Sequence, residues 1–474
     1  MNQFERNEIG LIVHDEALLW KITDFCICIE NSAMKVIFLF LFIILLTPAK
    51  AQDSLYVHIQ LLDKKTGDVV PNVNVTVLNG SDRMRILTST QKGTIGFYAQ
   101  KGGFVKTSYS HPIYQSSGKD ISIPSSGDTL RQEVLLTAEK FTNLGDVVIK
   151  PVGTPYTVYG SQRLSVADFE IQKDGTFILL AYPKRLTKGS ELLVYNGQDV
   201  INSFQVPGIA KELTRDFRGN AHIVCEENVF GVHVDEGRVE IANLPKEYFA
   251  KYVMPIVDTN QSNVYFSNFN PDYPAFDYFS FDQLDSAYSK IVSIEDKLMM
   301  ELYRAEYKWA DVRIKLWAKQ KELETGVDAE IWVGANYFTR SIYYKELYAP
   351  MFHRNDTLFV FDYYKDKLLK FDHLGNALDS VAIFHHYQPK STGWKKDLMQ
   401  DPVTGQIYAR FEKSGLTYIG LIDTNTGEIK ERIQLEFQWV DKVAVHDNFV
   451  YYVYRPLESI QKRYLYKEQL PYKF

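Results

Sequence analysis

The chain has 474 residues, 45% of them hydrophobic and 24% charged, so it is long enough for two or three domains with apolar cores, and disorder is not expected. Its formal net charge of −6 is unlike that of nucleic-acid binders, which carry clustered basic faces, so no nucleic-acid partner is expected. Aromatic residues make up 14% of the chain, with 31 Tyr and 29 Phe, which favours β-rich packing.

An export signal is predicted near the N-terminus. Met34-Lys35 precedes the apolar run Val36–Leu46, and the triplet Ala49-Lys50-Ala51 follows it. A positive start, a short apolar core and an A-x-A end are the parts of a secretory signal peptide. The run is shorter than the roughly 20 residues of a membrane span, so we predict cleavage after residue 51 and no transmembrane span in the mature chain. A membrane anchor or a buried helix is the alternative.

Residues 34–51 are therefore predicted to be the signal peptide, and residues 1–33 a leader that arises from a wrongly placed start codon. The competing interpretation of the leader is a long n-region of the signal. Export predicts a protein of the bacterial cell envelope, in the periplasm or associated with the outer membrane or cell surface.

Residues 52–150 are expected to form a β-sandwich. Leu55, Val57, Ile59 and Leu61 alternate with polar residues, which is typical of a half-buried strand. Further short strands follow at intervals of about ten residues, separated by Gly, Ser and Asn, which indicates a sandwich. They are expected at Val73–Val77, Arg85–Thr88, Gly96–Tyr98, Val105–Ser108 and Arg131–Leu136.

This region resembles a known family. The motif Ile59-x-Leu61-x-Asp63-x-x-Thr66-Gly67-x-x-Val70-Pro71-x-Val73-x-Val75-x-Val77, with Gly93–Phe97 after it, looks like the carboxypeptidase regulatory-like domain. Leu144–Ile149 is similar to the closing strand of exported Bacteroidota proteins. Asn72 stands where the family usually has Gly, and Tyr109–Tyr114 where a Gly-Tyr step is common. The family domain is non-catalytic, so the resemblance implies a structural or adhesive module.

From residue 151 to residue 474 the chain repeats a unit of two strands around a tight turn, followed by a second hairpin. A period of about 40–50 residues with four strands per unit is typical of a β-propeller, because a ring of blades buries both faces of each sheet. The tight turns are at Gly175, Gly219, Ser262, Asp356, Gly405 and Asp447, and second hairpin turns are at Asn196-Gly197, Glu236-Gly237, Gly375 and Asn425-Thr426-Gly427.

We therefore predict about six blades, with an open solenoid or two unrelated sandwiches as the alternatives. Tyr156–Tyr159 is expected to supply a strand that closes the ring, and Arg463–Tyr466 the penultimate strand of the last blade. The run from Leu358 to Gly375 resembles the six-bladed propellers of exported Bacteroidota proteins.

The interval between the turns at Ser262 and Asp356 is longer than one repeat. It contains a helical pattern from Glu295 to Glu324, which predicts a helical insertion at 295–325. Two interpretations of this helix remain open: it buries its stripe on the propeller, or it is a lid or partner-binding helix that uses Leu302, Trp309 and Trp317. A third is a seventh blade built from Ile331–Val333 and Ser341–Tyr344. The predicted stripe comprises Leu298, Leu302, Ala305, Trp309, Val312 and Leu316, widened by Met299, Tyr303, Ala310, Ile314 and Trp317.

No catalytic motif is present: the chain has no G-x-S-x-G, H-E-x-x-H, P-loop or G-x-G-x-x-G. His385 and His386, as adjacent strand residues, would point to opposite faces and make poor metal co-ligands, so no metal and no cofactor are predicted. Inner-strand polar residues are the candidate ligand site, in the central channel, or else they cap turns. They are Asp168, Asp216, Asp258, Asp401 and His446.

The function predicted from the sequence is that of an exported, non-catalytic recognition or scaffold protein. Its partner is expected to be an envelope protein, or a glycan or peptide ligand, bound through the propeller face or the inserted helix. The alternative is a propeller hydrolase or lyase that uses channel carboxylates and a metal.

Overall fold

A computed structural model describes residues 54–79, 83–138, 154–235, 238–260, 262–325, 327–339 and 344–471. The predicted leader, the signal peptide, Leu144–Ile149, the Glu236-Gly237 turn and residues 341–343 lie outside the described residues, and their predictions stay predictions. In the described part of the chain, no helix is long and apolar enough to cross a membrane.

The chain divides into two compact units. Of the described residues, the smaller contains 54–58, Gly96–Val105 and Ile121–Gln132, and the larger contains the others. This division runs through the region predicted as a sandwich, and the larger unit holds everything that follows it.

The described residues between 54 and 138 form two sheets with the orders β4-β1-β7 and β3-β2-β5-β6. Every strand expected from its alternation is present, and the side chains of Leu55, Val57, Ile59 and Leu61 are fully buried. β6 was not expected, because its sequence YQSSGKDIS shows no apolar alternation. The strands are β1 (Ser54–Asp63), β2 (Asn74–Asn79), β3 (Arg83–Thr88), β4 (Thr94–Gln100), β5 (Phe104–His111), β6 (Tyr114–Ser122) and β7 (Thr129–Leu136).

Asn72 adopts a backbone conformation that usually favours Gly. Its φ is 56°, in the left-handed region where Gly is favoured and Asn is the best-tolerated substitute. The Asn at this position therefore keeps the backbone conformation that a Gly would supply.

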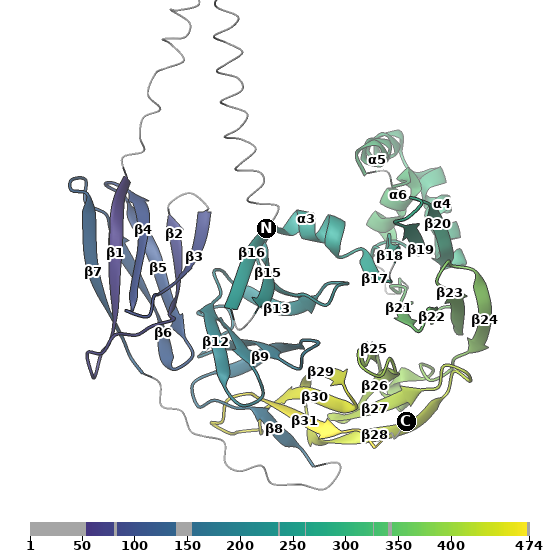
Figure 1. Ribbon diagram of the computed structural model, residues 1–474. Helices are drawn as coiled ribbons and strands as arrows, with labels where there is room; N and C mark the ends of the chain where they lie inside the picture. Colours follow the sequence, from purple (N-terminus) through teal and green to yellow (C-terminus); the bar gives the residue numbers. More distant parts are fainter. Residues whose placement is uncertain are drawn as a thin grey trace, which may run out of the picture. The chain divides into compact units, whose positions relative to one another are not determined.

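Residues 156–469 form a succession of four-stranded antiparallel sheets, consistent with a propeller (Figure 1). In the described residues their strand orders are β12-β11-β10-β9, β13-β14-β15-β16, β17-β18-β19-β20, β21-β22-β23-β24, β25-β26-β27-β28 and β29-β30-β31-β8. The bounds are β8 (Tyr156–Tyr159), β9 (Ser165–Ile171), β10 (Phe177–Tyr182), β11 (Glu191–Tyr195), β12 (Val200–Gln205), β13 (Ala210–Arg215), β14 (Ala221–Cys225), β15 (Asn228–Asp235), β16 (Arg238–Pro245), β17 (Ile256–Thr259), β18 (Asn263–Ser267), β19 (Ala275–Asp282), β20 (Tyr288–Glu295), β21 (Met351–Arg354), β22 (Thr357–Asp362), β23 (Lys367–Asp372), β24 (Ala377–Ala382), β25 (Trp394–Gln400), β26 (Ile407–Lys413), β27 (Leu416–Ile422), β28 (Ile429–Gln438), β29 (Asp441–His446), β30 (Phe449–Tyr454) and β31 (Tyr464–Gln469).

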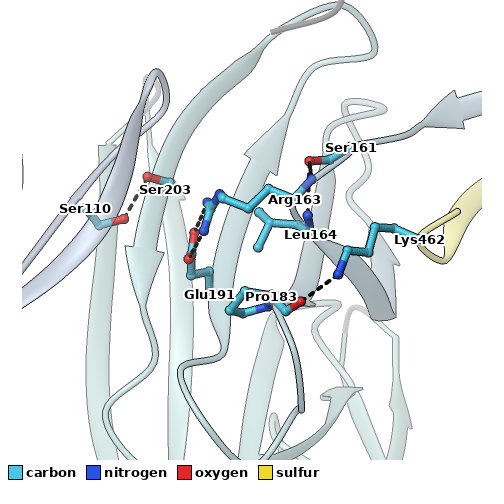
Figure 2. Close-up of polar contacts among 8 residues, drawn as sticks. All are labelled: Ser110, Ser161, Arg163, Leu164, Pro183, Glu191, Ser203 and Lys462. Atoms are coloured by element: carbon cyan, nitrogen blue, oxygen red, sulfur yellow. Dashed lines mark hydrogen bonds and ion pairs between the residues drawn. The ribbon is translucent and has the colours of Figure 1, made fainter. Parts of the chain in front are cut away.

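The closing strand is confirmed. β8 pairs antiparallel with β31, which places residues 156–159 in the same sheet as the C-terminal strands. Polar contacts on both sides of this pairing are shown in Figure 2. Before β31, Lys462 Nζ donates to the Pro183 carbonyl at 2.8 Å. After β8, the Arg163 guanidinium forms two hydrogen bonds with the Glu191 carboxylate. The last sheet and the β9–β12 sheet also share a buried core that includes Phe169, Tyr195 and Tyr451.

Buried apolar clusters join successive sheets along the chain. Their members come from adjacent sheets, as when Phe361 of β22 packs with Ile407 of β26. The connection from β16 to β17 is made by α3 (Lys246–Tyr248) and a π-helical turn, Phe249–Val253.

The single helix predicted over residues 295–324 is wrong. The insertion contains α4 (Lys297–Trp309), α5 (Val312–Thr325) and α6 (Ala329–Phe338), and the chain is extended at Ala310, with ψ 147°. Asp311 starts the second helix by accepting a hydrogen bond from the Arg313 N–H at 2.8 Å. The seventh-blade alternative is also wrong, since Ile331–Val333 belongs to α6. A last short helix, α7, spans Pro389–Thr392.

Candidate functional site: the helical insertion

The helical insertion lies between β20 and β21 and has a core of its own. The buried Tyr303 of α4 stacks on Phe338 of α6, with ring centroids 5.4 Å apart, and its hydroxyl donates to the Asp272 carbonyl at 3.1 Å. Gly334 makes this contact possible, because a Cβ there would lie 2.2 Å from the Tyr303 ring. On the other side of α6, Val333 and Ala329 pack against Ala318 of α5. The three helices therefore form a small packed unit (Figure 1).

The apolar stripe predicted for this helix is exposed. Met299 and Tyr303, which were expected only to widen the stripe, form the buried side of α4 instead. Burial of the predicted stripe is therefore the wrong interpretation for these positions. The exposed fractions are 70% for Leu298, 40% for Leu302, 81% for Trp309, 67% for Val312 and 66% for Leu316.

α5 is apolar on two faces. Ile314 and Ala318 face the core with α6, while Val312, Leu316 and Leu323 recur at spacings of four and seven on another face. Leu323 is 89% exposed. We call Trp309, Val312, Leu316 and Leu323 the apolar stripe. A helix that only covers a core has one apolar face, so this second face indicates a surface for binding.

A surface pocket of about 320 Å³ opens between α5 and α6. It is lined by Arg313, Ile314, Trp317, Asn336 and Tyr337. Trp317, a residue predicted from the sequence, is 38% exposed, and its ring meets that of Trp332 edge-on at 6.1 Å. Arg313, Asn336 and Tyr337 were not predicted, because charged and polar residues on a helix usually mark a solvated face.

The inner-strand residues predicted as a ligand site mainly make structural contacts, and their role in ligand binding stays a prediction. Buried Asp168 accepts from the backbone N–H of Phe169 and of Leu213 in the next sheet, at 3.0 Å each. Buried Asp401 accepts from Val403 in its own turn and from Asp447 and Asn448 of the next sheet. Burial raises the pKa of Asp401, but these backbone N–H groups outweigh it and hold the pKa below its usual value.

Asp216 and Asp258 make separate local contacts, whereas His446 lies near enough to Asp401 for that carboxylate to act on the pKa of His446. Asp216 caps its turn, and its carboxylate lies 3.0 Å from His222 Nε2. Burial raises the pKa of Asp216, but these hydrogen bonds outweigh it and hold the pKa below its usual value. Asp258 accepts from the Thr259 N–H, and burial raises the pKa of Asp258. Burial lowers the pKa of His446.

Ion pairs that the sequence did not reveal link three inner strands. Lys442 of β29 lies 2.9 Å from Asp168 of β9 and 3.7 Å from Glu212 of β13, and Arg215 of β13 lies 2.8 Å from Glu170 of β9. Nearby cations thus neutralise these inner-strand carboxylates. Across the described residues, no group of three or more His, Cys, Asp or Glu side chains is arranged to hold a metal ion.

His385 and His386 do not lie on a strand, which corrects the prediction that they point to opposite faces. They lie in the turn after β24, and both rings contact Tyr363. The Tyr363 hydroxyl and His385 Nε2 are 2.7 Å apart, and His386 Nε2 lies 2.9 Å from Asp366. Trp394 packs on Tyr363 at 4.7 Å, so the cluster is mainly an aromatic core.

This cluster predicts a loss of stability in acid. Burial, with a contribution from His386, lowers the pKa of His385 to about 4, against 6.5 for the unperturbed side chain. As the pH falls from 6.5 to 4, the unfolded chain binds a proton that the folded chain does not, so folding weakens by about 2 to 3 kcal/mol. Urea denaturation at pH 7 and pH 4.5 should show that His385→Gln removes much of this loss. Equal pH dependence in the two proteins would contradict the assignment.

Comparison with solved structures gives distant likenesses. No protein-family model matches the sequence, and no curated protein is detectably similar to it. A luciferin-regenerating enzyme is 8% identical, with a TM-score of 0.33 over 67% of this chain and 95% of that chain. Regucalcin, a calcium-binding protein from Agrobacterium tumefaciens, is 11% identical, with a TM-score of 0.29 over 65% of this chain and 91% of that chain. The extracellular domain of a one-component system from B. thetaiotaomicron is also 11% identical, with a TM-score of 0.29 over 64% of this chain and 32% of that chain.

Proposed function

We propose that this protein is an exported recognition protein of a bacterial cell envelope that binds a partner protein through its helical insertion. In this proposal residues 34–51 direct export, residues 52–150 form a carboxypeptidase regulatory-like sandwich, and residues 151–474 form a six-bladed propeller. The order of the sheets and the pairing of β8 with β31 support the propeller. The motif from Ile59 to Val77 supports the sandwich.

The observation that carries the proposal is the exposed apolar stripe. Monomeric proteins expose single apolar side chains widely, but a group of large ones close together usually marks an interaction site. Trp309 is 81% exposed and Leu323 is 89% exposed. Two contacts with α6 hold these residues in place: Tyr303 of α4 packs on Gly334 and Phe338, and Ala318 of α5 packs with Ala329 and Val333.

The residues around the stripe favour a protein partner. Lys308 lies 5.7 Å from the Trp309 ring, and Lys319 and Lys321 are paired with Glu322 and Glu324. Large aromatic and aliphatic anchors inside a rim of paired charges are the usual composition of a protein interface. On this proposal the propeller is the rigid scaffold and the insertion is the part that recognises the partner.

Affinity capture from the native envelope fraction tests the proposal. We expect the native protein to retain a partner that the double variant Trp309→Glu/Leu316→Glu loses. Both side chains are exposed, so the variant should fold with a change of less than about 1 kcal/mol in stability.

Ile460→Glu is the control, because Ile460 is a fully exposed apolar residue outside the insertion. It should leave capture unchanged. If the stripe variant captures the same proteins as the native chain, the insertion is not the recognition surface.

A further inference from the structure

The pocket between α5 and α6 has one charged residue, and its charge is not neutralised. In the described part of the insertion, Arg304, Lys319 and Lys321 each form an ion pair with a glutamate, whereas Arg313 forms none. Lys297, Lys308 and Lys315 of this described part form none either, but of these four cations only Arg313 lines the pocket. The other lining side chains are apolar, aromatic or amide: Ile314, Trp317, Asn336 and Tyr337. A guanidinium beside aromatic walls favours an anion that also carries an apolar group.

The spacing of these residues limits the shape of such a ligand. Arg313 and Trp317 are one turn apart on α5, so their side chains begin about 5–6 Å from each other. Asn336 and Tyr337 approach from α6. The amide of Asn336 can both accept and donate a hydrogen bond. A ligand that fits brings together an anionic group, an apolar group and a polar N–H or C=O within a few ångströms.

The C-terminal residue of a polypeptide has this arrangement. Its carboxylate and its side chain leave the same Cα, and its backbone N–H lies beside both. An Asp or Glu side chain has a carboxylate but no apolar group attached to it. Planar, bidentate recognition of carboxylates is a use to which Arg is well suited.

We propose that this pocket binds the C-terminal residue of the partner protein, an apolar residue whose carboxylate contacts Arg313 and whose side chain packs against Trp317 and Tyr337. The inference rests on the proposed function and specifies the chemistry of the partner. Leu316 lies three residues after Arg313 and Val312 directly precedes it, so the apolar stripe is adjacent to the pocket. The residues of the partner that precede its C-terminus would lie along that stripe.

Peptide binding to the purified protein tests the inference. The probes are N-acetyl-Ala-Leu-Phe with a free carboxylate and the same peptide as its C-terminal amide, titrated by calorimetry at low salt. We expect the acid to bind at least tenfold more tightly than the amide, and the difference to shrink as salt rises. Arg313→Gln should reduce binding of the acid to the level of the amide. Lys290→Gln, which lies outside the insertion on β20 and is paired with Asp277, should leave the preference intact.

Several results would overturn the inference. They are equal binding of the acid and the amide, no binding of either, and a preference that survives Arg313→Gln. Binding of galacturonic acid in place of the peptide acid would also overturn it and assign the pocket to an acidic sugar.

The Trp309→Glu/Leu316→Glu protein separates this inference from the proposed function. If acid selectivity is absent but this variant still loses the captured partner, the inference fails and the proposed function stands. If capture does not depend on the stripe, the proposed function fails whatever the peptides do.

Discussion

Arg163→Met should lower the free energy of unfolding by about 3 to 5 kcal/mol, the usual result of removing one member of a buried ion pair. The Arg163 guanidinium bonds both oxygens of Glu191, at 2.7 and 2.8 Å (Figure 2). The Glu191 side chain is only 3% exposed, while that of Arg163 is 22% exposed. Met keeps the apolar stem of the side chain, so the loss comes mainly from leaving a carboxylate buried without its cation.

Chemical denaturation followed by fluorescence and circular dichroism would measure this loss. Lys290→Met is the control, because it breaks a pair with Asp277 in which the lysine is 54% exposed, and it should cost less than about 1 kcal/mol. Adding Glu191→Leu to Arg163→Met removes the buried charge and should recover part of the stability. A loss for Arg163→Met no larger than that of the control would show that the pair contributes little.

Much of the strand repeat could be predicted because turns and alternation are local. Gly175 and Gly405 have positive φ values of 84° and 69° at turns placed from the sequence, and β1 buries every second residue as expected. The closing strand β8 was found because the repeat left its last unit one strand short. β6 was missed for the opposite reason, since most of its side chains are polar and exposed.

The helical insertion shows where periodicity stops being informative. The spacing of Leu298, Leu302 and Trp309 correctly indicates one face of a helix, but spacing alone cannot say whether a neighbour covers that face. Tertiary contacts decide it: Gly334 admits the Tyr303 ring, which turns Met299 and Tyr303 inward and the predicted stripe outward. The break at Ala310 was hidden because Trp309, Val312 and Leu316 continue the periodicity across it.

The candidate site was predictable only in part. Trp317 was singled out for its aromatic ring, and it does line the pocket. Arg313 could not be distinguished from the lysines of the same helix until the structure showed that it lines the pocket. Lys442 was missed among the inner-strand residues because a search for ligand-binding acids overlooks the cation that neutralises them.

Gly427→Ala should be the second strongly destabilising substitution, at about 3 to 4 kcal/mol. Gly427 has a φ of +76°, and a Cβ there would lie 2.2 Å from the Ala382 carbonyl oxygen and 3.0 Å from the Ile383 side chain. The substitution combines the cost of a left-handed conformation with a clash against the backbone of the neighbouring sheet, which no rotamer change can relieve.

Gly197→Ala separates these two costs. Gly197 also lies in a hairpin turn with positive φ, +95°, but nothing lies within 4 Å of its would-be Cβ. Only the backbone cost of about 1 to 2 kcal/mol should therefore appear in its denaturation curve. If the two variants lose equal stability, the hairpin at Gly427 does not pack against residues 382–383. A difference of about 2 kcal/mol would show that the β27–β28 hairpin packs against β24 of the neighbouring sheet. The sequence does not reveal this contact between sheets.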